Sequence, residues 1–193
     1  MGVSVAYGQV AVYVCWGAVA LVWVGGAAAS HSGESSRQSE RDTASRMAGA
    51  LAVLTLLSPA SWWRALTVHS APVTAVGVAI LVPATGFTLW ARVRLGSMWS
   101  SAPSTKAAHE LRTDGPYRVT RHPVYTGIMA MMLGTGLVQG AGKWLVLVVV
   151  VVAAVVAKTI AEERLLVGQF PSTYERYRHD VPRLVPRIRS RGR

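Results

Sequence analysis

The chain has 193 residues; 51% of them are hydrophobic and 15% are charged, with 20 Lys and Arg against 9 Asp and Glu. Because a soluble domain carries about a quarter charged residues, this composition excludes both an ordinary soluble domain and a disordered chain. The single cysteine, Cys15, excludes a disulfide framework. A net charge of +11 is compatible with binding of nucleic acid, but the uneven distribution of the charges favours a membrane protein that binds no nucleic acid.

Five apolar segments predict five membrane-spanning helices and an all-α fold. No charged side chain occurs from Met1 to Ser30, and three later segments of 17 to 21 residues are equally free of charge. A membrane-spanning helix needs about 20 predominantly apolar residues. The fifth segment contains thirteen consecutive apolar residues from Leu145, a run too long for a typical buried strand. We therefore expect spans at about residues 9–29, 47–63, 71–91, 123–141 and 144–161, in a single domain over residues 1–193.

The basic residues predict the orientation of these spans. If all five segments cross the membrane, 18 of the 20 Lys and Arg residues lie on one side, and only Arg64 and Lys143 lie on the other. Basic residues accumulate on the cytoplasmic side of membrane proteins. The pattern therefore predicts a multi-pass protein of a bacterial-type plasma membrane, with an outer amino terminus, a cytoplasmic carboxy terminus and a basic tail that attracts anionic lipids.

Two local signals interrupt the apolar segments. Pro59 is expected to kink the second span, because proline cannot donate a helical hydrogen bond. Residues 140–142, Gly-Ala-Gly, leave room only for a tight helical hairpin between spans 4 and 5. The two ends of this hairpin are therefore expected at the same membrane face.

A further helix is predicted in the carboxy-terminal tail, at about residues 172–181. Ser172 and Glu175 form a capping-box pattern at its start. Tyr174 and Tyr177 then share one face of the helix. This helix is either an interfacial amphipathic helix or a wall over a site at the cytoplasmic membrane surface.

Two polar stretches contain the residues best suited to chemistry. The first runs from His109 to Gly127, and the second, Lys158–Leu165, ends the fifth span. Lys158 and Glu162 are four residues apart and therefore share one helical face. Each residue alone is explained as part of a turn, an interfacial base or a solvated helix end. Together, ionisable groups gathered at membrane depth are candidates for function.

Four motifs follow one another in the second half of the chain. They are Gly-Pro-Tyr-x-x-x-Arg-His-Pro-x-Tyr-x-Gly at 115–127, Glu-Glu-x-x-Leu from 162, Tyr-x-x-Tyr at 174–177 and Val-Pro-Arg-Leu-x-Pro at 181–186. In this order they resemble the isoprenylcysteine carboxyl methyltransferase family, whose wider group includes membrane phospholipid methyltransferases. The resemblance covers about residues 90–186. It implies an all-α integral membrane enzyme that holds S-adenosylmethionine in a cytoplasmic pocket, formed by the loop before span 4, the hairpin of spans 4 and 5 and the carboxy-terminal helix.

The resemblance also implies which residues bind the cofactor and the methyl acceptor. Lys158 stands where the family has an arginine that faces the acceptor, so we expect it to bind substrate and to take part in catalysis, together with Arg121. Lysine keeps the charge but lacks the planar donor fork of arginine. Glu162 is expected to contribute more than Glu163, since consecutive helical positions point about 100° apart. The implied cofactor-binding residues are His109, Glu110, Leu111, Arg112, Tyr117, His122, Pro123, Val124, Tyr125 and Glu162.

Sulfonium methyl transfer needs no metal. The methyl group moves by in-line displacement, so alignment and exclusion of water supply most of the rate, and no cluster of Cys and His has metal-ligand spacing. A carboxylate or thiolate acceptor needs no general base, whereas an amine needs one, for which His122 and Glu163 are the nearest candidates. We therefore predict an S-adenosylmethionine-dependent methyltransferase whose partners are a lipophilic acceptor, isoprenylcysteine carboxylate-like or another hydrophobic compound, and membrane lipids. No obligate protein partner is expected.

Three other functions stay open at this point. One is a phospholipid N-methyltransferase, and another is an NADPH-dependent reductase of the sterol-reductase type, which shares a related membrane architecture. The third is a membrane component without enzymatic activity. The acceptor cannot be identified from the sequence, because spans 1–3 consist largely of Val, Ala and Leu.

Overall fold

The computed structural model describes residues 2–29, 41–95 and 111–186. In these residues the chain forms helices and no strand, and one isolated bridge of extended backbone joins Thr67 to Ala141. The predicted all-α architecture is confirmed. The helices are α1 (Gly2–Ala29), α2 (Arg41–Leu57), α3 (Ala60–Trp63), η1 (Arg64–Leu66), α4 (Ala71–Leu95), η3 (Gly115–Arg118), α5 (Pro123–Val138), α6 (Lys143–Gln169) and α7 (Pro171–Asp180).

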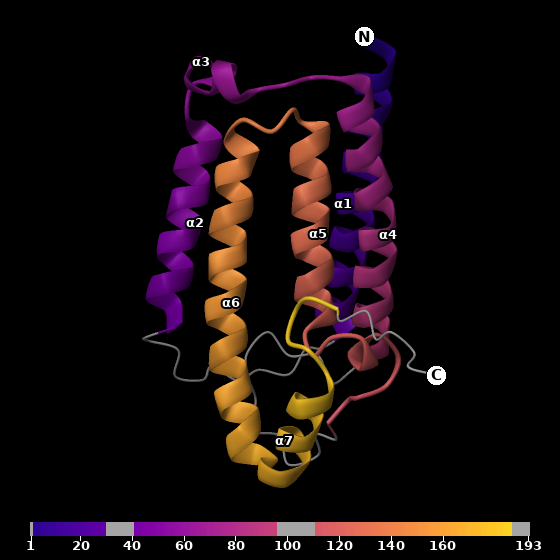
Figure 1. The fold of residues 1–193 in the computed structure, drawn as a ribbon, viewed down its shortest axis with the longest axis vertical. Helices are drawn as coiled ribbons and strands as arrows, with labels where there is room; N and C mark the ends of the chain where they lie inside the picture. Colours follow the sequence, from indigo (N-terminus) through magenta and orange to yellow (C-terminus); the bar gives the residue numbers. More distant parts are fainter. Residues whose placement is uncertain (1, 30–40, 96–110, 187–193) are drawn as a thin grey trace, which may run out of the picture.

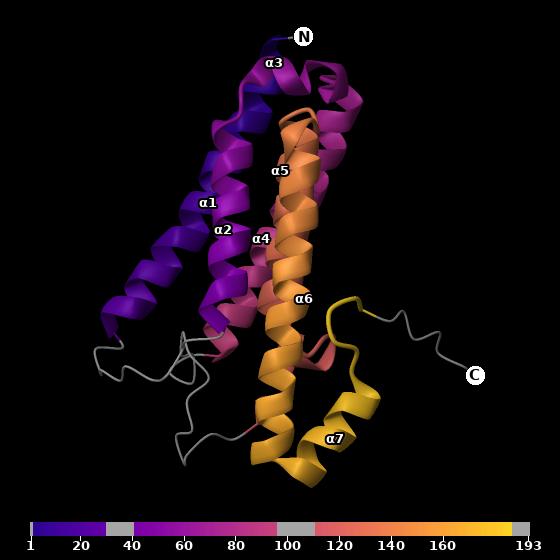
Figure 2. The ribbon, with the colours of Figure 1, turned by 90° about the vertical axis from the view of Figure 1, so that its left-hand side faces the viewer.

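The long helices α1, α2, α4, α5 and α6 run side by side along the long axis of the molecule (Figure 1). α4 packs against α1 and α5, and α6 packs against α5 and α2. The short helix α3 lies at one end and α7 at the other. We call them the hairpin end, where residues 139–142 connect α5 to α6, and the α7 end. In the perpendicular view, α1 leans away from α6 towards the α7 end (Figure 2).

Three helical segments of the described residues are long and apolar enough to cross a membrane: Ala6–Gly25, Ala71–Leu95 and Lys143–Gly168. The shorter helix α5 is also apolar. Large apolar side chains on these helices are exposed, for example Leu21 at 75% and Val149 at 67%. A helix that is apolar all round is suited to lipid rather than to water. These are the features of an integral membrane protein, and three of the five predicted spans meet the full criterion of length and composition.

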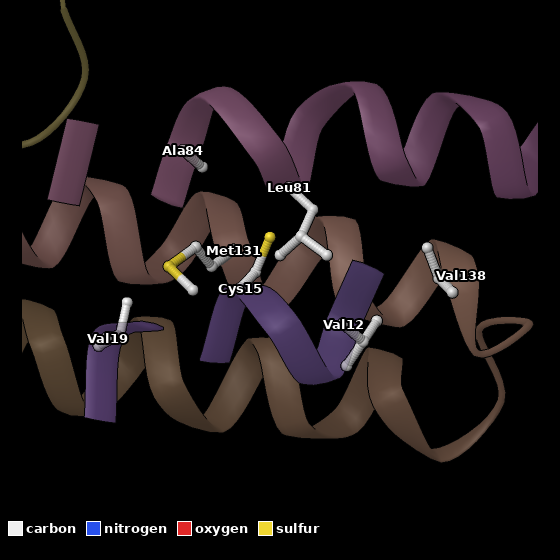
Figure 3. Close-up of a cluster of buried hydrophobic side chains, with 7 residues drawn as sticks. All are labelled: Val12, Cys15, Val19, Leu81, Ala84, Met131 and Val138. Carbon is white, nitrogen blue, oxygen red and sulfur yellow. The ribbon is translucent and has the colours of Figure 1, made fainter. Parts of the chain in front are cut away.

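A small apolar core joins α1, α4 and α5 (Figure 3). It consists of Val12, Cys15, Val19, Leu81, Ala84, Met131 and Val138. Cys15 is buried in it as a small apolar side chain. Beside this core α4 and α5 approach backbone to backbone: a Cβ added to Gly77 would lie 2.8 Å from the carbonyl oxygen of Gly134, and the reverse holds at Gly134. Only glycine permits this close approach.

The predicted second span, residues 47–63, is wrong in its bounds. α2 ends at Leu57, and Pro59 separates it from the one-turn helix α3. Proline lacks an N–H group and disfavours a helical conformation of the residue before it. Trp62 and Trp63 therefore belong to a separate turn at the hairpin end and not to the end of a continuous span.

The two carboxy-terminal helices also differ from their predicted bounds. α6 continues two turns beyond Ala161, so Glu162 and Glu163 are both helical. α7 begins at Pro171, and no side chain caps it, so the predicted capping box is wrong. Pro171 occupies the first helical turn, where the missing N–H of proline is tolerated.

The tight hairpin between α5 and α6 is confirmed. Gly140, Ala141 and Gly142 all have positive φ, at 83°, 62° and 53°. The segment before α4 holds the turn, since the N–H of Val68 donates to the carbonyl of Gly140 at 2.8 Å and the N–H of Gly142 donates to the carbonyl of Leu66 at 3.0 Å. The hairpin fixes α5 and α6 antiparallel. The start of α5 and the end of α6 therefore lie together at the α7 end.

Candidate active site

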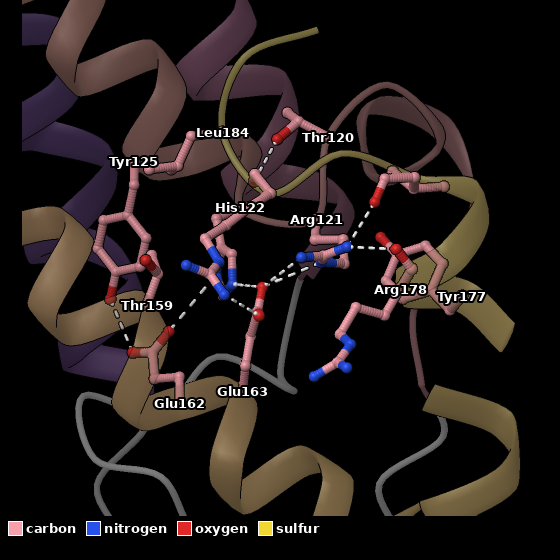
Figure 4. A network of polar contacts seen from close by, with 12 residues as sticks. Thr120, Arg121, His122, Tyr125, Thr159, Glu162, Glu163, Tyr177, Arg178 and Leu184 are labelled. Carbon is pink, nitrogen blue, oxygen red and sulfur yellow. Dashed lines mark hydrogen bonds and ion pairs between the residues drawn. The ribbon is translucent and has the colours of Figure 1, made fainter. Parts of the chain in front are cut away.

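Polar side chains from separate parts of the chain meet at the α7 end of the bundle (Figure 4). His122 and Tyr125 stand at the start of α5, and Glu162 and Glu163 lie in the last third of α6. Pro123 occupies the first position of α5, where its fixed φ favours the helix and its missing N–H removes no helical hydrogen bond. The cluster therefore depends on two features: Pro123 starts α5 at this end, and the hairpin brings the end of α6 back beside it.

Glu162 and Lys158 both lie against Tyr125. The hydroxyl of Tyr125 donates a hydrogen bond to Oε1 of Glu162 at 2.8 Å, and Nζ of Lys158 lies 5.4 Å from the centre of the Tyr125 ring. Nδ1 of His122 lies 3.6 Å from Oε2 of Glu162. The Glu162 side chain is 24% exposed, so its carboxylate keeps acceptor capacity for a bound molecule. The predicted common face of Lys158 and Glu162 is confirmed.

Glu163 lies on a different face of α6, and only 3% of its side chain is exposed. Its Oε1 accepts hydrogen bonds from Nε of Arg121 at 3.0 Å and from Nε2 of His122 at 3.2 Å, and it forms an ion pair with Nη2 of Arg121 at 2.9 Å. Its Oε2 accepts a hydrogen bond from Nη2 of Arg183 at 2.8 Å. Such charge-assisted hydrogen bonds replace the water that a buried carboxylate loses. Glu163 thus pairs with a base of the carboxy-terminal tail, Arg183, as well as with Arg121.

Arg121 binds the carboxy-terminal segment as well as Glu163. Its Nη1 donates to the carbonyl oxygens of Arg178 and Val181, at 2.7 and 2.6 Å, and its side chain is 7% exposed. The carbonyl of Arg178 belongs to the last turn of α7, where carbonyl groups lack helical partners. These contacts occupy Nε, Nη1 and Nη2 of Arg121, the groups that would have to donate to the carboxylate of a bound cofactor. The catalytic role expected of Arg121 stays a prediction. Its structural role is to join Glu163 to the carboxy-terminal segment.

The backbone of Val181–Leu184 crosses the start of α5, and we call this segment the strap. The N–H groups of Arg121 and His122 donate to carbonyl oxygens of the strap at 2.9 and 3.2 Å. The hydroxyl groups of Thr120 and Thr126 also donate to strap carbonyls, at 2.6 and 2.7 Å. Sequence reasoning missed these contacts because their acceptors are backbone groups. The Val-Pro-Arg-Leu-x-Pro motif was the one sequence signal that pointed to the segment.

α7 packs its tyrosine face inwards. The hydroxyl of Tyr177 donates to the carbonyl oxygen of Tyr117 at 2.6 Å, and Tyr174 is fully buried with its ring centre 6.0 Å from that of Tyr177. Burial raises the pKa of Tyr117 to about 12 and raises the pKa values of Tyr174 and Tyr177 as well, so the three hydroxyls stay protonated near neutral pH. Of the two interpretations of this helix, a wall beside the site agrees with these contacts.

Other expected cofactor residues have contacts of their own or lie outside the described residues. Arg112 joins a separate ion-pair group at the end of α4, in which Asp114 lies 3.5 Å from both Arg112 and Arg94. Leu111 precedes this group, and Val124 lies in the first turn of α5. His109 and Glu110 lie outside the described residues. The structure thus brings His122, Tyr125, Lys158 and Glu162 together, whereas Arg112 pairs with Asp114.

The fold and the cluster first define a class: a helical membrane protein with a polar site at one end of an apolar hairpin. Residues 72–173 match the family described as phospholipid methyltransferase, and this region is more than half of the chain. The protein therefore belongs to the phospholipid methyltransferase family. The matched region runs from the start of α4 to the start of α7 and includes both glutamates.

Two relatives are similar to this chain over about half of its length. The protein-S-isoprenylcysteine O-methyltransferase of Schizosaccharomyces pombe is 36% identical over 101 residues, which are 51% of this chain and 43% of the relative. Methanethiol S-methyltransferase 2 of Bradyrhizobium diazoefficiens is 33% identical over 87 residues, which are 45% of this chain and 33% of the relative. The matched regions therefore span less than half of each relative.

Proposed function

We propose that this protein is an S-adenosylmethionine-dependent methyltransferase that acts at a membrane on a lipophilic acceptor. Family membership supports the transfer of a methyl group. The observation that carries the proposal is the partly exposed carboxylate of Glu162 beside Tyr125 and Lys158, at the end of an apolar hairpin. Ionisable groups at such a place are costly to keep and mark functional sites.

The charges of the cluster fit the proposed cofactor. S-adenosylmethionine carries a positive sulfonium, a positive ammonium and ribose hydroxyls, all of which suit a carboxylate acceptor. Tyr125 uses one acceptor position of Glu162, and a carboxylate offers about four. Glu162 is therefore the residue to which we assign the ribose hydroxyls or the ammonium. The further cofactor contacts in this proposal are His109, Glu110, Leu111, Arg112, Tyr117, His122, Pro123, Val124 and Tyr125.

The acceptor is proposed to be an anion. When bound, the cofactor supplies a methyl group activated by positively charged sulfur. Lys158 offers an exposed ammonium beside the same ring that contacts Glu162, which suits a carboxylate or a thiolate and aligns it for displacement. An amine acceptor requires a general base, and Glu163 is unsuited to that role because both of its oxygens accept hydrogen bonds in a buried position. One relative is named as an isoprenylcysteine O-methyltransferase and the other as a methanethiol S-methyltransferase, so neither name points to an amine acceptor.

The proposed topology has five spans with the α7 end in the cytoplasm. α1, α4 and α6 have the length for spans, and the shorter α2 and α5 run beside them. Arg64 and Lys143 belong to the hairpin end, whereas Arg121, Arg178 and Arg183 belong to the α7 end. This asymmetry supports a cytoplasmic α7 end, and a single domain over residues 1–193 is part of the same proposal.

The experiment compares two ligands on the purified protein in detergent. Calorimetric titration with S-adenosylhomocysteine is expected to give saturable binding, and titration with NADPH is expected to give none. Glu162→Gln is the matched variant, since it keeps the shape of the side chain and removes the charge. Binding of NADPH in place of S-adenosylhomocysteine would reassign the protein to the reductase class. Absence of S-adenosylhomocysteine binding would contradict the proposal.

A further inference from the structure

A continuous series of polar contacts links the exposed side of the cluster to the strap. Glu162 accepts from Tyr125 at 2.8 Å, and His122 lies between the two glutamates, with Nδ1 3.6 Å from Glu162 and Nε2 3.2 Å from Glu163. Glu163 in turn accepts from Arg183 of the strap at 2.8 Å. The orientation of the His122 ring therefore depends on where the carboxylate of Glu163 points.

The two oxygens of Glu163 have different partners. Among the residues that the structure describes, Oε1 accepts from Arg121 and His122, and Oε2 accepts from Arg183 alone. If Arg183 is removed, Oε2 becomes a buried acceptor without a donor, and the carboxylate gains by turning towards any remaining donor. Because Oε1 is part of the same rigid group, its hydrogen bond with His122 then changes too.

The strap does not need the side chain of Arg183 to stay in place. Four hydrogen bonds from residues 120–126 reach carbonyl oxygens of the strap, and they involve its backbone only. Arg121 adds a contact to the carbonyl of Val181. The side chain of Arg183 is also partly exposed, at 36%, so its removal opens no large cavity. Its contact with Glu163 is thus an addition to an already anchored segment.

We propose that Arg183 is a positioning residue of the methyl-transfer site, which acts through Glu163 to hold His122 beside Glu162. The proposal rests on the proposed function for its cofactor readout. It also makes a structural statement that holds without the cofactor: the ring of His122 reports on the side chain at position 183.

The test uses three variants of the full chain in detergent. Arg183→Gln removes the charge, Arg183→Lys keeps it, and Arg176→Gln removes one positive charge from an exposed position of α7. Nitrogen-15 spectra of the histidine side chains measure His122 directly, with its signals assigned by substitution of the other histidines one at a time. Calorimetry with S-adenosylhomocysteine measures affinity well below the unfolding temperature, and thermal unfolding measures stability.

Arg183→Gln is expected to shift both ring-nitrogen signals of His122 and to weaken S-adenosylhomocysteine binding about 3- to 30-fold, the range typical of indirect coupling between neighbouring residues. Arg183→Lys is expected to restore most of both effects, and Arg176→Gln to change neither. Unchanged His122 signals in Arg183→Gln would overturn the proposal. So would a lower unfolding temperature with unchanged affinity, because that result describes a purely structural residue. If the unsubstituted protein binds no S-adenosylhomocysteine, the proposed function fails, and the His122 signals still decide whether Arg183 positions the ring.

Discussion

Changing each of the two neighbouring glutamates to glutamine should have different effects: Glu162→Gln should weaken ligand binding, and Glu163→Gln should lower stability. Glu162 is 24% exposed and accepts one hydrogen bond, from Tyr125, which a glutamine oxygen can still accept. The expected loss is therefore that of the negative charge, which is proposed to bind the cofactor. A hydrogen bond to a charged group contributes about 1.5–3 kcal/mol, so Glu162→Gln should weaken S-adenosylhomocysteine binding roughly 10- to 150-fold. The unfolding temperature should hardly change.

Glu163→Gln should act first on stability. The carboxylate is 3% exposed, and it neutralises Arg121, which is itself 7% exposed. Removing one member of a buried ion pair leaves an uncompensated charge, which typically costs about 3–5 kcal/mol. A carboxamide also brings an N–H₂ group towards the donors of Arg121 and Arg183. The strap should loosen at a lower temperature than in the unsubstituted protein.

The assay is thermal unfolding of both variants in the same detergent, followed by calorimetric titration with S-adenosylhomocysteine at a temperature where both are folded. Glu175→Gln is the control, because Glu175 forms an exposed pair with Arg178 at 3.3 Å, and such pairs contribute about 0–1 kcal/mol. The reasoning is refuted if Glu162→Gln lowers the unfolding temperature more than Glu163→Gln does. It is also refuted if Glu162→Gln binds as tightly as the unsubstituted protein.

Three further predictions concern the acceptor, the pH dependence and the topology. Lys158→Met should lower the turnover of an anionic lipophilic acceptor about tenfold or more, with little change in S-adenosylhomocysteine affinity. Lys158→Arg should retain activity. Steady-state kinetics measure the turnover of both variants, and separate titrations measure their affinity for S-adenosylhomocysteine. Burial raises the pKa of Tyr117 from 10.0 to about 12, so the stability from its protonated form is complete below pH 10 and is lost as the pH rises towards 12. Because the pKa values of Tyr174 and Tyr177 are raised as well, unfolding followed across this range should show a smaller loss of stability in Tyr117→Phe than in the unsubstituted protein, and an equal loss would contradict the prediction. A cysteine placed at Ser104 should react with an impermeant reagent only from the cytoplasmic side, and labelling from outside would reject the topology.

Features with local causes could be predicted from the sequence. Gly140 and Gly142 specify a turn by their backbone freedom, and a long apolar run specifies a helix in lipid. The spacing of Lys158 and Glu162 follows from helical geometry once α6 is accepted. These predictions succeed because each depends on a few neighbouring residues and not on the rest of the fold.

Features that depend on distant backbone could not be predicted. Arg121, Thr120 and Thr126 bind carbonyl oxygens of the strap, and a carbonyl has no signature in a sequence. The start of α7 was misplaced for a different reason: Ser172 and Glu175 imitate a capping box, but Pro171 enters the first turn of the helix. The end of α2 shows the same limit, because Pro59 breaks the helix there instead of bending it.

The most direct test of the central claim is transfer of a labelled methyl group. The protein in detergent is incubated with S-adenosylmethionine that carries a deuterated methyl group, in the presence of a metal chelator, with a prenylated cysteine carboxylate, a lipophilic thiol and phosphatidylethanolamine as competing acceptors. Mass spectrometry is expected to find the label on the carboxylate or the thiol, and Glu162→Gln is expected to abolish most of it. No labelled product from any acceptor, or a reaction that requires a divalent metal, would contradict the account.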